Sequence, residues 1–252
     1  MKTKSVCFIL AVVLITGTIT YQSCRSARMV LEYRTDTIYT NREAKGDILE
    51  VRFRRGSEHN HPLMAVWVED TSGRFIQTLY VAESIAKGVF GHGDKSTGKW
   101  LPGPIQRPAA LPVWSHSRGV REANGLYVPT SETPIADAYT GATPPGHFVL
   151  IAKTDNPLPD AFYVYFEINQ TWDWNFYWTN NRFPDDENYK TSCQLALVYR
   201  TLVTLNDGQD YKKMELVGHS SYNGENGQIF TNLDSITTAK DITESVSVKW
   251  IR

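Results

Sequence analysis

Hydrophobic and polar residues form short alternating or apolar runs along much of the chain, a pattern typical of β-strands rather than helices. The segment Asp47–Arg55 alternates apolar and charged residues, as a strand does when one of its faces is buried. The runs Met64–Glu69 and Phe75–Val81 flank Asp70–Gly73, whose residues favour a hairpin turn. Further strands are predicted at His147–Lys153, Phe162–Asn169, Gln194–Val203, Lys213–Gly218 and Ser245–Ile251.

Short strands separated by turn residues predict an all-β fold, and specifically an immunoglobulin-like β-sandwich that spans residues 47–252. Helical turns are expected only at Ile85–Phe90 and Ser235–Ser245. Over residues 84–142 the strand pattern breaks down and proline is frequent, so we expect a long irregular insertion over one end of the sandwich.

The first residues have the layout of an export signal, in which Lys2 and Lys4 precede the short apolar run Val6–Ile15. Ser23 followed by Cys24 resembles the cleavage site of bacterial lipoproteins, where the cysteine becomes the lipidated first residue of the mature protein. Plain secretion and an uncleaved anchor are the alternatives.

This interpretation predicts a signal peptide of the lipoprotein type over residues 1–23 and a polar tether over residues 24–46. The protein is then expected in the cell envelope, on the periplasmic side or as an outer-membrane lipoprotein, held to the membrane through Cys24. With Cys24 lipidated, Cys193 has no partner in the mature domain, and we expect it to be a buried, inert thiol.

Composition agrees with a folded domain, since 41% of the residues are hydrophobic and 21% are charged. The aromatic share of 12% favours β-structure. The 26 basic and 27 acidic residues nearly cancel, which gives no basic surplus for a nucleic-acid backbone. Nucleic-acid binding is therefore excluded from the expected functions.

The most specific local motif is Asp137-Ala-Tyr-Thr-Gly-Ala-Thr143, which precedes a predicted strand. It resembles the Asp-x-x-Ser/Thr-Gly-Ala-Thr motif that extracytoplasmic flavin transferases recognise. The resemblance implies that Thr143 accepts FMN through a phosphoester bond, with Asp137, Thr140, Gly141 and Ala142 as the surrounding motif residues. The alternative is a plain turn between strands, since Asp, Thr, Gly and Pro are common turn residues.

A second candidate site is the aromatic stretch that follows Asn169, in which even spacing places Trp172, Trp174 and Trp178 on one side of an extended chain. On a surface these rings can hold a sugar or an isoalloxazine ring, and we expect Tyr139, Trp172 and Trp174 to shield a flavin on Thr143. The alternative is an aromatic cluster that closes one end of the sandwich.

Other chemistry finds little support in the sequence. His59 and His61 have the spacing of metal ligands, but no third ligand lies nearby in the sequence, so we interpret them as part of a solvated loop. We expect no metal site, no catalytic residues and no enzyme activity from this chain alone, because no pattern places a nucleophile beside a base.

Three segments, Ala65–Asp70 with the following Gly73, Asp137–Gly146 and Trp172–Cys193, are similar to the domain of unknown function 2271 family of predicted periplasmic proteins. Members of that family are often encoded near flavin transferases and membrane redox proteins. The resemblance implies a lipid-anchored accessory protein of a flavin-dependent electron-transfer system, with those proteins as partners. The alternative is a cofactor-free module that binds carbohydrate or protein.

Overall fold

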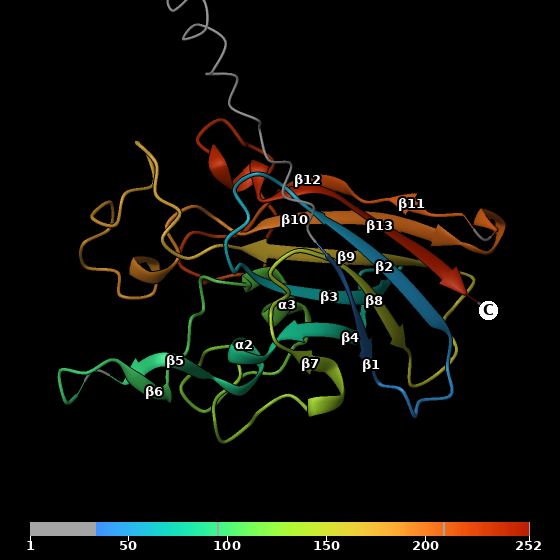
Figure 1. The fold of residues 1–252 in the computed structure, drawn as a ribbon, viewed down its shortest axis with the longest axis horizontal. Coiled ribbons are helices and arrows are strands. Elements are labelled where there is room, and N and C mark those ends of the chain that lie inside the picture. The colour runs from blue at the N-terminus through green and yellow to red at the C-terminus, as the bar shows by residue number, and fades with distance from the viewer. Residues whose placement is uncertain (1–33, 95, 209, 252) are drawn as a thin grey trace, which may run out of the picture. The chain divides into compact units, whose positions relative to one another are not determined.

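The computed structural model describes residues 34–94, 96–208 and 210–251 of the chain. In this part of the chain, two β-sheets pack face to face around a hydrophobic core (Figure 1). The predicted all-β sandwich is therefore confirmed. The predicted signal peptide and Cys24 lie outside the described residues.

The first sheet has five strands in the spatial order β1-β8-β2-β13-β11. The edge strand β1 pairs with β8 in parallel, and the other neighbours are antiparallel. The bounds of these strands, in spatial order, are Thr35–Thr40, His147–Lys153, Ile48–Arg55, Thr243–Ile251 and Lys212–Lys213.

The second sheet has six strands in the spatial order β12-β10-β9-β3-β4-β7, and a separate hairpin joins β5 to β6. The short strand β7 pairs with β4 in parallel, whereas the other pairs in this sheet are antiparallel. In spatial order, the six strands span Glu215–His219, Leu197–Thr204, Ala161–Asn169, Leu63–Asp70, Phe75–Ala82 and Thr140–Gly141, and the hairpin spans Val89–Asp94 and Leu101–Pro104.

Helices are few and short in the described residues. The α-helices α2 and α3 span Glu83–Lys87 and Pro112–Ser117. Single 3-10 turns occur at η1 Asp137–Tyr139, η2 Tyr189–Thr191, η3 Leu205–Asp207 and η4 Thr238–Asp241. None of the helices in the described ranges has the length and apolar character that a membrane crossing requires.

All eight predicted strands are present, but the predicted strand Lys213–Gly218 divides between the two sheets. Lys212–Lys213 pairs with β13, whereas Glu215–His219 pairs with β10. The buried side chain of Met214 lies between the two short strands, and its backbone N–H donates to the carbonyl of Val246. The segment predicted as one strand therefore crosses from one layer of the sandwich to the other.

The expected tether is shorter than predicted, because Thr35–Thr40 forms β1 within the first sheet. Ile38 of this strand packs against the core, and Thr40 is buried. The strand satisfies the backbone hydrogen bonds of β8 that would otherwise face solvent at the edge of the sheet. Its threonines and tyrosine have high β propensity, but its polar character resembles that of a linker.

Burial explains the two kinds of strand pattern. Strand β2 alternates between buried and more exposed residues because only its inner face meets the core. Strand β3 is buried on both faces, because the outer face of the second sheet carries a second hydrophobic cluster. In that cluster, the side chains of Leu111 and Trp114 pack with Trp67 and Tyr165 of the sheet.

The insertion predicted over residues 84–142 supplies this second cluster and is more ordered than expected. It contains α2, the β5–β6 hairpin, α3, η1 and β7. The fully buried carboxylate of Glu167, on β9, accepts hydrogen bonds from the backbone N–H groups of Val113 and Trp114 at the start of α3, at 3.2 and 2.8 Å. These contacts fix the insertion to the outer face of the second sheet.

Candidate functional site

The motif residues Asp137–Thr143 form a turn of 3-10 helix followed by an edge strand. Thr140 and Gly141 pair with Val81 and Ala82 of β4, so the motif extends the second sheet. The buried hydroxyl of Tyr80 lies 3.1 Å from the carbonyl oxygens of Gly141 and Ala142 and donates to them. The chain is therefore held in place just before Thr143.

Gly141 is required here by packing. A Cβ atom at this position would lie 3.1 Å from Cε2 of the Tyr80 ring, which is closer than ordinary van der Waals contact. The space beside Gly141 is filled by the ring of Tyr80, so the absence of a side chain here lets the motif backbone lie against that ring.

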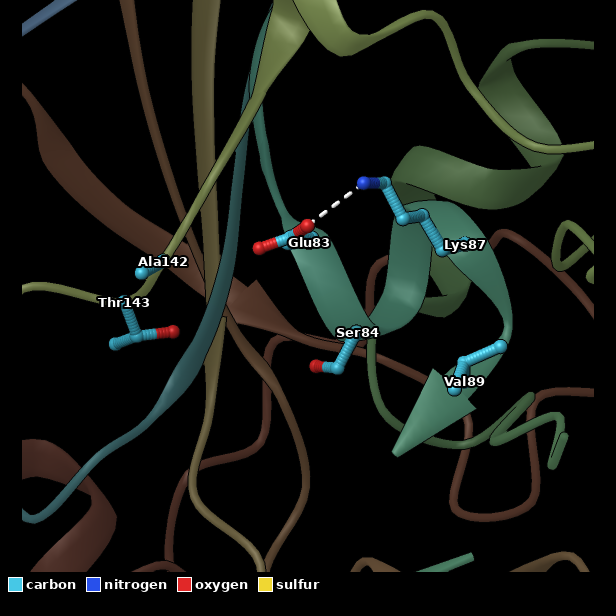
Figure 2. A pocket seen from close by; sticks show the side chains of 6 residues that line it. All are labelled: Glu83, Ser84, Lys87, Val89, Ala142 and Thr143. Atoms are coloured by element: carbon cyan, nitrogen blue, oxygen red, sulfur yellow. Dashed lines mark hydrogen bonds and ion pairs between the residues drawn. The ribbon is translucent and has the colours of Figure 1, made fainter. Parts of the chain in front are cut away.

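Thr143 lies at the rim of an open pocket of about 340 Å³, on the side of the second sheet where α2 begins. Figure 2 shows its hydroxyl directed across the pocket toward Ser84. The Thr143 side chain is half-buried, and among the described residues its hydroxyl has no hydrogen-bond partner. The pocket is lined by Glu83, Ser84, Lys87, Val89, Ala142 and Thr143.

Lys87 is the basic residue of this pocket. Its ammonium lies 2.7 Å from a carboxylate oxygen of Glu83 and 3.2 Å from one of Asp137 (Figure 2 shows the first contact). The bonds to Glu83 and Asp137 raise the pKa of Lys87. A neighbouring pocket of about 440 Å³ shares Lys87 and Val89 and extends toward Asp137. The two pockets therefore follow the motif from its first residue to its last.

Tyr139, predicted to shield a flavin, does not line the pocket beside Thr143. Its hydroxyl instead donates to the carboxylate of Asp155, at 2.9 and 3.0 Å from the two oxygens. Burial and this carboxylate raise the pKa of Tyr139 to about 12. Tyr139 thus joins the motif to the chain that leaves β8.

The tryptophans of the second candidate site do not share one face of an extended chain, which corrects the sequence prediction. Trp172 is 61% exposed and Trp174 is 44% exposed, whereas Trp178 is only 8% exposed and belongs to the main core. The segment that joins β9 to β10 turns repeatedly, and Trp172 itself has a φ of 68°, so even spacing does not place the side chains on one side.

Trp178 closes one end of the core, as the alternative interpretation expected. Its indole N–H donates to the hydroxyl of Ser235 at 3.0 Å, and its ring packs near Phe183 and Tyr189. Trp172 and Trp174 contact each other edge to face, with ring centroids 5.5 Å apart. Neither lines the pocket beside Thr143, so the two candidate sites are separate.

The remaining sequence candidates have structural roles. His59 is buried, which corrects the expectation that it lies in a solvated loop, whereas His61 is exposed. Burial followed by the charge of Arg55 lowers the pKa of His59 to about 4. Cys193 is buried as predicted, and burial raises the pKa of its thiol to about 11. Within the described ranges no group of three or more His, Cys, Asp or Glu side chains is arranged to hold a metal ion.

Sequence reasoning missed Tyr80 and Lys87, which complete the surroundings of the motif. Both precede the motif by fifty residues or more, and neither belongs to a motif that indicates a site. Comparison with known proteins adds no further candidates, because no family model, curated protein or solved structure matches this chain.

Proposed function

We propose that this chain is an exported, lipid-anchored accessory protein of a membrane-linked redox system, and that it carries FMN on Thr143. The observation that supports the proposal best is the hydroxyl of Thr143, which opens into a pocket and has no hydrogen-bond partner among the described residues. An acceptor for a phosphoester must be a hydroxyl that a modifying enzyme and a flat ring can both approach.

The surroundings of Thr143 fit such a group. The pocket is open, so a ring system attached to Thr143 has room beside α2. Lys87 is the basic residue at the pocket, and because its ammonium is paired with Glu83 and Asp137, binding a phosphate oxygen requires that it use its remaining N–H or release one of these carboxylates. Tyr80 holds the preceding carbonyls, which limits the movement of the attachment point.

Attachment joins Thr143 Oγ1 to the FMN phosphorus while the pyrophosphate bond of a flavin adenine dinucleotide donor breaks. AMP leaves, and the hydroxyl proton is released. Bound FMN supplies electron transfer in one- or two-electron steps. The chain's own contribution is to fix the hydroxyl at the pocket and to place Lys87 beside it.

The test is intact mass and in-gel flavin fluorescence of the protein after coexpression with a flavin transferase. We expect the wild-type protein to carry one FMN, Thr143→Ala to carry none and Thr143→Ser to retain some. Thr71→Ala is the control for the loss of a threonine hydroxyl, since Thr71 is exposed in the turn between β3 and β4 and lies outside the motif, and we expect it to keep the flavin. A wild-type mass without a flavin adduct would refute the proposal.

A further inference from the structure

Four aromatic side chains in one short segment are exposed to solvent. We call Trp172, Trp174, Phe176 and Tyr177 the aromatic patch. Phe176 is 84% exposed and Tyr177 is 38% exposed, in addition to the two exposed tryptophans. Isolated exposed apolar residues are ordinary, but four large rings within six residues indicate a contact surface.

Hydrogen bonds from both flanks hold the patch in place. The side-chain amide of Asn175 donates to the carbonyl of Ser235 at 2.8 Å, and its oxygen accepts from the backbone N–H groups of Tyr177 and Trp178. Arg182 lies over the ring of Tyr177, with 3.5 Å from the guanidinium carbon to the ring centroid. The rings are therefore presented on a fixed backbone, which lowers the entropy cost of a contact.

The register of the strands places this patch at the end of the sandwich where the described chain begins. The segment that carries the patch leaves β9 at Asn169, which pairs with Leu63 at the start of β3. A short connection joins Leu63 to Arg55, the end of β2. At that same end of the first sheet, β1 and β8 begin together, with Thr35 opposite His147 (Figure 1).

The segment between Cys24 and β1 is short. Nine residues lie between the predicted lipid attachment site Cys24 and Arg34, the first described residue. Even a fully extended segment of this length reaches at most roughly 35 Å. A lipid on Cys24 therefore limits how far the start of β1 can lie from the membrane surface.

We propose that the aromatic patch contacts the lipid bilayer that holds the acyl anchor. Indole and phenol rings favour the boundary between headgroups and acyl chains, and Phe176 adds an apolar side chain at the most exposed position. The connection between β9 and β10 holds two basic residues, Arg182 and Lys190, of which Lys190 pairs with Glu187, and it holds an excess of acidic side chains: Asp173, Asp185, Asp186 and Glu187. They disfavour an anionic surface, so the contact is with zwitterionic lipid and is driven by apolar burial.

The orientation of the sandwich on the membrane relies on the lipid anchor of the proposed function. The contact between the aromatic patch and a bilayer can be measured without an anchor. The experiment uses residues 25–252, which lack both the apolar run Val6–Ile15 and the acylated cysteine, in flotation with phosphatidylcholine vesicles. We expect binding that weakens when phosphatidylglycerol is added. The double change Trp172→Ser with Phe176→Ser should lower the partition coefficient by about tenfold or more.

Tyr39→Ser is the matched control, because Tyr39 is 49% exposed and lies near the opposite end of β1. We expect it to bind vesicles like the parent chain, and so should Thr143→Ala, which separates this contact from the flavin proposal. Near-UV circular dichroism verifies that the variants are folded. Equal partition of parent and double variant, no vesicle binding, or a change in tryptophan emission with glycans but not with vesicles would each overturn the proposal.

Discussion

The buried carboxylate of Glu167 makes a prediction about how stability depends on pH. Burial raises the pKa of this group to about 8, and the two backbone N–H groups at the start of α3 oppose the rise only in part. In the unfolded chain an ordinary glutamate loses its proton near 4.5. Between these values the folded protein binds a proton that the unfolded chain does not, so the free energy of unfolding falls as pH rises.

The clearest range for this effect is pH 6.5 to 8. Below pH 6.5 the titration of unfolded His59 acts in the opposite direction, since burial lowers the pKa of the folded histidine to about 4. One pKa unit corresponds to about 1.4 kcal/mol, so Glu167 should remove roughly 1.5 kcal/mol of stability between pH 6.5 and 8. Glu167→Gln keeps the shape and one acceptor oxygen but cannot titrate. Between pH 6.5 and 8, the free energy of unfolding of this variant should therefore fall by roughly 1.5 kcal/mol less than that of the wild type.

Urea unfolding followed by tryptophan fluorescence at several pH values between 6.5 and 8 measures this difference. Glu244→Gln is the control for the loss of one negative charge, because Glu244 lies on the exposed side of β13. We expect its stability to follow the wild-type dependence on pH. If the Glu167→Gln and wild-type curves run parallel, then Glu167 is ionised in the folded protein at pH 6.5 and the reasoning from burial is wrong.

Three further predictions test the interior. From pH 6.5 toward 4, unfolded His59 binds a proton that the folded residue does not, whereas Glu167 acts in the opposite direction, so the free energy of unfolding of His59→Phe should rise relative to that of the wild type as pH drops, as read by chemical denaturation. Tyr80→Phe should lower the free energy of unfolding by about 1–2 kcal/mol, as it leaves the carbonyls of Gly141 and Ala142 without their donor, and chemical denaturation measures this. Cys193 should resist iodoacetamide at pH 8 in the folded protein and react in urea, as read by mass, since burial raises its pKa to about 11.

The strands of the sandwich were predictable because burial imposes a period on the sequence. Strand β2 alternates visibly, and β3 is an apolar run that both hydrophobic clusters cover. Strands β1 and β7 lack this signal, since β1 is polar and β7 has only two residues. Edge strands depend on one neighbour for their hydrogen bonds, and the sequence does not show where that neighbour lies.

The candidate sites were predictable only in part. The motif Asp137–Thr143 was visible as a local pattern, but Tyr80 and Lys87 reach it through the fold. The even spacing of tryptophans predicted one shared face because it assumed an extended chain. The left-handed backbone of Trp172 and the turn around Asn175 break that assumption. Asparagine commonly forms such turns, but a left-handed backbone is unusual for tryptophan and does not follow from its residue type.

The position of β13 determines when this protein can finish folding. This strand, Thr243–Ile251, lies inside the first sheet, where β2 flanks it on one side and β11 on the other. The pairing of β2 with β13 joins segments that almost the whole described chain separates, and such distant pairings form slowly. A nascent chain without Thr243–Ile251 leaves β2 unpaired on one side and β11 without a partner, so synthesis of this segment has to precede a closed first sheet, and its deletion should prevent folding.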